Sequence, residues 1–177
     1  TFLDNTLQLN TAVFFNDYQD IQLVLSQCEV PPFIDPDGIA GPCLKPANVG
    51  DADIKGLELE AMWYPTDGLM LDASASWLDF EYTYVDPVAL VGSSIDPMDM
   101  ISPYTPEEKF SGGIQYTFGT SGSGSFTVRL DGSYQSKQYA DPTNKPVNKI
   151  DSYALFNALA WWEGANGDWR IQLEWLN

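Results

Sequence analysis

Apolar and polar residues alternate along most of this chain. Between positions 69 and 77 the odd positions are Leu, Leu, Ala, Ala and Trp, whereas the even positions are Met, Asp, Ser and Ser. Because successive side chains of a β-strand point to opposite faces, this alternation predicts a strand with one apolar and one polar face. The pattern predicts seven strands, at about residues 7–16, 57–63, 69–77, 110–118, 126–135, 152–162 and 169–175. The stretch 152–162 is more apolar, so its facing stays open.

The connections between the predicted strands alternate between short turns and long loops. The turns cover residues 65–68, 119–124 and 164–168, and the loops cover about 26–52, 84–107 and 138–150. The loops hold most of the prolines and many of the acidic residues. Short turns at one end of a sheet and long loops at the other are typical of outer-membrane barrels, where the turns face the periplasm and the loops face outwards.

Aromatic residues gather at the two ends of the predicted strands. Near the short turns lie Trp63, Tyr64, Tyr116, Phe118, Trp161, Trp162 and Trp169; near the long loops lie Tyr18, Trp77, Phe80, Tyr82, Tyr84, Tyr134 and Tyr139. A soluble β-sandwich would place its large aromatic residues mid-strand, in the core. Two belts separated by smaller apolar residues instead resemble the girdles at the two membrane interfaces.

Charge narrows the possible functions. The chain has 25 acidic and 8 basic residues, a formal net charge of -17 and no His. Such a chain repels phosphates, so we expect no nucleic-acid partner. The lack of His excludes a Ser-His-Asp triad, and we expect neither an enzyme nor a cofactor. No apolar run is long enough for a transmembrane helix.

The second face of the strands carries charged residues that need water. We expect the following side chains to face the lumen of a barrel: Glu58, Glu60, Asp72, Arg129, Asp131, Arg170 and Glu174. A closed eight-stranded barrel fills its interior with side chains, and too few basic residues exist here to pair these carboxylates. Bacterial barrels also usually have an even number of strands. A segment of a wide, wet barrel therefore fits better than a small complete one.

Several motifs, spread over nearly the whole chain, resemble one family in the family's own order. Residues 48–60 (NVGDADIKGLELE) resemble the "NAG-A-x-x-x-G-x-E" strand of TonB-dependent receptors, and residues 14–22 (FFNDYQDIQ) resemble the "F-Y-N-x-Y-x-D-I-Q" strand. Residues 103–110 (PYTPEEKF) resemble the segment "P-x-x-P-x-x-x-F", and residues 132–137 (GSYQSK) resemble the "Y-x-S" strand end. Residues 65–79 resemble the turn and strand that follow the first motif.

This resemblance implies a fold and a function. The fold is all-β, an antiparallel transmembrane β-barrel segment of about seven strands within a larger barrel of about 22 strands. Residues 1–177 would form the C-terminal portion of the barrel, without the plug domain and the final strand. The implied function is active uptake of a scarce solute, such as a ferric siderophore, across the bacterial outer membrane. The implied partners are the lipid bilayer, the solute and, through the missing plug, TonB.

The long loops hold the candidate binding residues. Cys28 and Cys43 lie in one Pro- and Gly-rich loop, and we expect a disulfide, with two free thiols as the alternative. Loop residues that are candidates for ligand contact are Phe33, Asp35, Asp37, Asp96, Asp99 and Tyr104. Asp35 and Asp37 lack the spacing of an EF-hand, so solvated carboxylates are expected rather than a calcium site.

Two other functional classes stay open at this point. One is a small stand-alone outer-membrane barrel with a structural or adhesive role, which would close by itself. The other is a soluble β-sandwich that binds a ligand. The pair Glu58 and Glu60 also has a spacing that a glycosidase uses, but hydrated carboxylates on a lumen wall explain it more simply.

Overall fold

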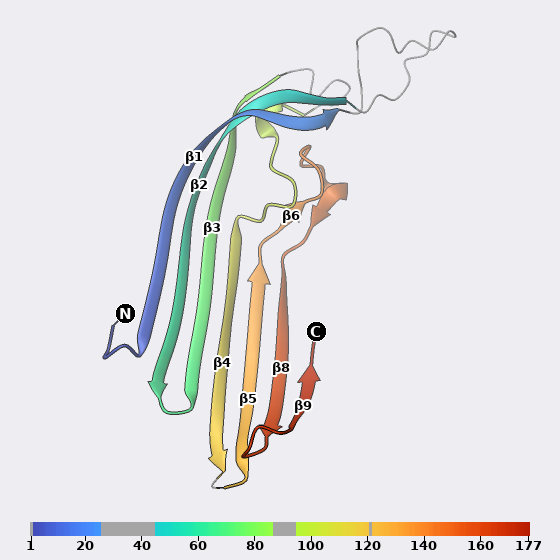
Figure 1. Cartoon of the computed structure of the whole chain (residues 1–177). Coiled ribbons are helices and arrows are strands. Elements are labelled where there is room, and N and C mark those ends of the chain that lie inside the picture. The colour runs from blue at the N-terminus through green and yellow to red at the C-terminus, as the bar shows by residue number, and fades with distance from the viewer. Residues whose placement is uncertain (1, 26–44, 87–94, 121) are drawn as a thin grey trace.

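The computed structural model describes residues 2–25, 45–86, 95–120 and 122–177. These residues form one antiparallel sheet of seven strands in the order β1-β2-β3-β4-β5-β8-β9. The strands are β1 (Leu7–Leu25), β2 (Lys45–Thr66), β3 (Leu69–Val85), β4 (Glu108–Thr120), β5 (Gly124–Gln135), β8 (Tyr153–Glu163) and β9 (Arg170–Trp175). Figure 1 shows them side by side in a curved sheet. The prediction of seven antiparallel strands is confirmed.

Each strand of the sheet pairs with the neighbouring sheet strand in chain order. The β5–β8 connection carries a separate small hairpin, β6 (Gln138–Tyr139) and β7 (Lys149–Ile150), and two 3-10 turns are η2 (Pro97–Asp99) and η3 (Pro146–Asn148). Within the described residues β1 and β9 pair only on one side, so the sheet is open. No helix in the described part of the chain is long and apolar enough to cross a membrane.

The register of the strands sorts the side chains onto two faces. In one row Ala75, Phe110 and Tyr134 are paired across β3, β4 and β5; in the next row Ser74, Ser111 and Ser133 are paired. We call the face with the first row the apolar face and the face with the second row the polar face. This sorting follows from the pleat, because a one-residue step moves a side chain to the other face.

The register also decides the facing of β8, which the sequence left open. Leu155 is paired with Ser133 and therefore lies on the polar face, whereas Phe156 is paired with Gly132 and lies on the apolar face. Trp161 is paired with Thr127 and shares the polar face with Leu155. Both tryptophans were predicted for the aromatic belt near the short turns. Trp162 lies on the apolar face, whereas Trp161 does not.

Aromatic contacts on the apolar face form two bands, as predicted. Towards the long loops, the ring of Phe110 lies 5.3 Å from that of Trp77 and 6.0 Å from that of Tyr134, between centroids. Towards the short turns, the ring of Phe118 lies 4.5 Å from Tyr116 and 6.1 Å from Phe126. Interfacial girdles of a membrane barrel have this arrangement.

The strands nearest the N-terminus are longer than the alternation predicted. β1 has 19 residues, β2 has 22 and β3 has 17, so residues 45–52 are strand and not loop. The pattern ends early because β1 contains a bulge: its register shifts between Tyr18 and Ile21, and Asp20 has a φ of 59°. A bulge interrupts the two-residue period, which hides the continuation of a strand from sequence analysis.

A small buried core lies at the long-loop end of β2 and β3. It consists of Ala52, Tyr82, Val85 and Met100, with Phe80 packed against it. Met100 follows η2, so this core fastens the segment after β3 to the sheet. Tyr82 is only 2% exposed, which corrects its assignment to an aromatic belt at the membrane interface.

Candidate functional site

Hydrogen-bonding side chains cross the polar face of β3, β4 and β5 in successive rows. The hydroxyl oxygens of Ser74 and Ser111 lie 2.8 Å apart, and Ser133 is the next residue of that row. One row nearer to the short turns, Asp72, Gly113 and Asp131 are paired. These serine and aspartate side chains lie on the face for which lumen-facing residues were predicted.

An ion-pair network spans the three strands at this level. Nη1 of Arg129 lies 2.8 Å from Oδ1 of Asp72 on β3, and Nη2 lies 2.6 Å from Oδ1 of Asp131 on β5. Oδ1 of Asp72 accepts no hydrogen bond of good geometry from the described residues, so that contact is an ion pair. The three side chains are between 21% and 29% exposed, so solvent screens the pairs only in part.

The network depends on a missing side chain at Gly113. A Cβ at this position would lie 2.4 Å from Nη2 of Arg129 and 2.8 Å from Oδ1 of Asp72. Since heavy atoms cannot approach that closely, any other residue would displace the guanidinium. Gly113 is therefore the position that lets Arg129 reach across β4 to β3. The sequence alternation shows Gly113 only as a small residue.

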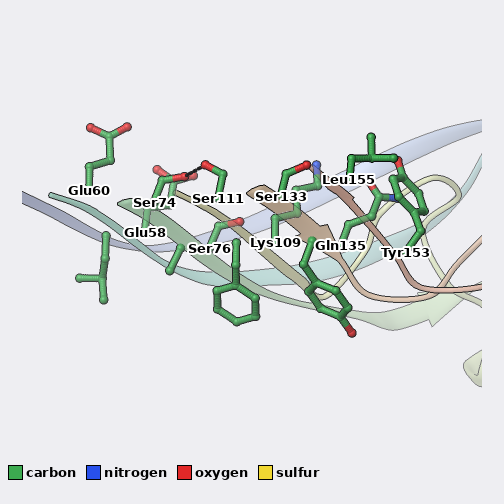
Figure 2. Close-up of a pocket in the computed structure, with 14 residues that line it drawn as sticks. Glu58, Glu60, Ser74, Ser76, Lys109, Ser111, Ser133, Gln135, Tyr153 and Leu155 are labelled. Carbon is green, nitrogen blue, oxygen red and sulfur yellow. Dashed lines mark hydrogen bonds between the residues drawn. The ribbon is translucent and has the colours of Figure 1, made fainter. Parts of the chain in front are cut away.

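A hollow of about 420 Å³ lies further towards the long loops on this face. Figure 2 shows Glu60, Ser74, Ser111 and Ser133 on one side of the sheet, with Glu58, Ser76 and Lys109 nearby. Glu60 accepts a hydrogen bond from Nδ2 of Asn10 at 3.4 Å. Glu58 and Glu60 are both exposed, which agrees with hydrated wall carboxylates rather than with a buried acid–base pair.

The remaining predicted lumen residues, Arg170 and Glu174, lie on β9. Their pairing with Glu163 and Leu159 places them on the polar face. The guanidinium carbon of Arg170 lies 4.5 Å from the centre of the Trp161 ring, a cation–π contact. Glu174 accepts a hydrogen bond from Gln172 on the same strand. All seven predicted residues therefore share one face, but Arg170 and Glu174 are separate from the Arg129 network.

The candidate ligand residues of the loops fall into two groups. Phe33, Asp35 and Asp37, like the predicted disulfide partners Cys28 and Cys43, lie outside the described residues, and their roles stay predictions. The second group consists of Asp96, Asp99 and Tyr104, which follow β3 and lie near η2. Their surroundings can be described.

Asp96 caps η2, because its Oδ1 accepts the backbone N–H of Met98 at 2.9 Å. Asp99 is exposed in the same turn. Tyr104 is 64% exposed and has a φ of 53°, a conformation that costs free energy in a non-glycine residue. The Tyr104 side chain therefore faces solvent, and the backbone that carries it is strained.

Two long loops are joined to each other above the polar face. The backbone N–H of Tyr104 donates to the carbonyl of Tyr139 at 2.8 Å, and that of Ile101 donates to the carbonyl of Pro142 at 3.1 Å. Asp141 organises the second loop by accepting hydrogen bonds from Thr143 and Asn148. The loops therefore form one unit, which the sequence did not predict.

A pocket of about 150 Å³ lies between this unit and β3. Its apolar side includes Leu78, Phe80 and Ile101, and its polar side includes Lys137 and Tyr139. Nearby, Lys149 and Asp151 form an ion pair at 2.5 Å, and hydrogen bonding and the charge of Asp151 raise the pKa of Lys149. No group of three acidic, Cys or His side chains in the described segments is placed to hold a metal ion.

Comparison with known proteins gives a consistent result. The family model "TonB dependent receptor-like, beta-barrel" matches residues 1–177. Among solved structures, the ferric yersiniabactin uptake receptor FyuA from Yersinia pestis matches with a TM-score of 0.70 and 20% identity, over 98% of this chain and 22% of that chain.

Two further solved structures are similar. BauA, the ferric preacinetobactin receptor from Acinetobacter baumannii, matches with a TM-score of 0.65 and 15% identity, over 96% of this chain and 22% of that chain. The FrpB iron transporter from Neisseria meningitidis matches with a TM-score of 0.65 and 14% identity, over 99% of this chain and 25% of that chain. At these identities the likeness concerns the fold, and the chain spans about a quarter of each or less.

Proposed function

Because this chain belongs to the TonB-dependent receptor family, through its β-barrel domain, we propose that the protein containing it takes up a scarce solute by TonB-dependent transport. The proposed solute is a ferric siderophore or a similar iron chelate. One observation carries the choice of solute: the similar solved structures are a ferric yersiniabactin uptake receptor, a ferric preacinetobactin receptor and an iron transporter.

Family membership settles the location and the broad class. Members of this family are outer-membrane β-barrel proteins of bacteria and are transporters, so the chain is outer-membrane barrel wall and not an enzyme. The open sheet agrees with a segment of a wide barrel and argues against the alternative of a small barrel that closes by itself.

The two faces of the sheet then take different environments. The apolar face, with its two aromatic bands, contacts lipid, and the polar face lines the lumen. We assign Glu58, Glu60, Asp72, Arg129, Asp131, Arg170 and Glu174 to the lumen wall, in agreement with their common face. The contact with TonB would be made by a plug domain elsewhere in the protein.

Solute contact is proposed for the joined loops rather than for the wall. The pocket beneath them has an apolar side and a polar side, and the polar side includes Lys137 and Tyr139 together with the carboxylates of Asp79 and Glu107. Ferric chelates carry apolar or aromatic groups together with negative charge. We propose that the apolar side takes the apolar groups and that Lys137 pairs with an anionic oxygen, against the repulsion of Asp79 and Glu107. Exposed Tyr104, at the junction of the two loops, offers an additional aromatic surface.

The test is iron uptake by the intact receptor in its own host. A strain that lacks the gene is supplied with single ferric chelates under iron limitation, and uptake of labelled iron is measured. We expect the strain without the gene to lose uptake of one class of ferric chelate and to regain it when the gene is returned. We also expect removal of TonB to abolish the same uptake. Equal uptake of all chelates with and without the gene would overturn the proposed solute class.

The loop assignment has its own test. Exchange of Lys137 for Gln in the intact receptor should weaken binding of an anionic chelate by about threefold to tenfold, since one charged contact is lost. Lys145 provides a matched control because it is exposed and does not line this pocket. An equal effect of Lys145→Gln would show that only the net charge of the loops matters.

A further inference from the structure

The two joined loops are fastened to the sheet by a buried apolar cluster. Met100 follows η2 and forms this cluster with Ala52, Tyr82 and Val85 of β2 and β3, where it is only 3% exposed. Met98, two residues earlier and inside η2, is 49% exposed. Because removal of apolar surface from water stabilises a contact, Met100 and not Met98 attaches this segment to the strands.

The residue after Met100 links the first loop to the second and also lines the pocket. The backbone N–H of Ile101 donates to the carbonyl of Pro142 at 3.1 Å, and the Ile101 side chain belongs to the apolar side of the pocket of about 150 Å³. Three residues further on, the N–H of Tyr104 donates to the carbonyl of Tyr139, which lines the same pocket. Because Met100 and Ile101 are neighbours in the chain, the position of Met100 determines where these contacts lie.

The same cluster supports the part of the pocket that belongs to the sheet. Phe80 of β3 packs against the cluster, and its ring lies 4.9 Å from that of Tyr82 in edge contact, between centroids. Phe80 also lines the pocket, together with Leu78 on the same strand. The apolar side of the pocket is therefore formed by two residues of the sheet and by Ile101 of the first loop, and the cluster that contains Met100 holds the two parts together.

The second loop depends on the first for its position. None of residues 138–150, all of which the structure describes, is buried. The internal order of this loop comes from polar contacts, such as the hydrogen bonds that Asp141 accepts within it. The hydrogen bonds from Ile101 and Tyr104 hold it against the first loop. A loop that buries no side chain of its own loses its position when the segment that holds it moves.

We propose that Met100 is a positioning residue for solute binding, because its insertion into the cluster holds both loops over β3 and so forms the pocket before any solute arrives. Met100 does not contact the solute and acts through Ile101 and Phe80. The effect on solute binding rests on the proposed function of the pocket. The placement of the two loops is a property of the chain itself and does not depend on which solute is transported.

The first experiment measures amide hydrogen exchange in the intact receptor without solute and compares Met100→Ala with the matched control Met98→Ala. For Met100→Ala we expect exchange about tenfold faster in residues 101–104 and also in residues 138–150, because a cavity in the cluster releases both loops. For Met98→Ala we expect a change within about twofold, because its side chain is already exposed. Met100→Leu refills the cluster and should restore slow exchange. Faster exchange confined to residues 101–104, or equal effects of the two alanine variants, would overturn the proposal.

The second experiment measures uptake of labelled iron supplied as a ferric trihydroxamate, a ferric tricatecholate or ferric citrate, each alone. For the chelate that is taken up, Met100→Ala should raise the half-saturating concentration about tenfold and leave the maximal rate within about twofold, since binding is weakened and transport is not. Met98→Ala and Met100→Leu should match the unaltered receptor, and all variants should keep its heat-resistant folded band. A lower maximal rate at an unchanged half-saturating concentration would contradict a positioning role. If the unaltered receptor takes up none of the chelates, the proposed function fails, and the exchange experiment still decides the placement of the loops.

Discussion

The polar face has two different surfaces, one on β3–β5 and one on β8. On β3–β5 it carries the ion-pair network of Arg129 and a row of serines, whereas on β8 the same face carries Leu155, Leu159 and Trp161. The backbone pairing is equally regular in both regions. The difference shows that the backbone pairing is the same throughout the sheet, whereas the side chains on its polar face vary from charged to apolar.

The largest effect in this comparison is expected from Arg129→Ala. The substitution leaves Asp72 and Asp131, which lie on either side of Gly113 in one row, without the cation between them, and we expect a loss of about 2–3 kcal/mol in the free energy of unfolding. Denaturant unfolding of the intact receptor in detergent measures it. A double variant that also carries Asp72→Asn should recover part of the loss; no recovery would show that the charges are not the cause.

Gly113→Ala should have the next largest effect. The added Cβ displaces the guanidinium from Asp72, which we expect to cost about 1–2 kcal/mol. Gly119→Ala is the control, because a Cβ at Gly119 meets no atom within 4 Å. Equal loss of stability in the two variants would attribute the effect to the backbone of β4 and not to the network.

Arg170→Gln probes the single cation on the β9 side of the face. It removes the cation–π contact with Trp161 and should cost about 0.5–1 kcal/mol, because the contact is exposed. The change in tryptophan fluorescence on unfolding reports the effect. A loss as large as that of Arg129→Ala would contradict the separation of the two sites.

Leu155→Ser should have the smallest effect. Leu155 is 37% exposed in the sheet and makes the β8 surface apolar without forming a core, so we expect a change within about 0.5 kcal/mol. The same unfolding measurement applies. A loss above about 1 kcal/mol in the intact receptor would show that another part of the protein packs on this surface.

Sequence alone determined the architecture of most of the sheet. Alternation places Asp72, Ser74 and Ser76 on one face and Ala73 and Ala75 on the other, and water on one side with lipid on the other makes that pattern strict. The family motifs added the identity of the barrel, which periodicity alone does not carry. The charged residues of the polar face were found because they occupy the polar positions of the two-residue alternation.

The tertiary structure decided what depends on neighbours across strands. β8 carries large apolar residues on both faces, so only its register with β5 assigns Leu155 and Phe156. Gly113 matters for the ion-pair network only because strand pairing places it between Asp72 and Asp131. Two other features depend on backbone conformation: the bulge at Asp20 and the hydrogen bond of Tyr104 that joins two loops. Neither produces a periodic pattern in the sequence. The two-residue period of the sequence indicates whether a side chain faces a polar or an apolar environment, whereas the pairing of the strands determines which side chains contact each other.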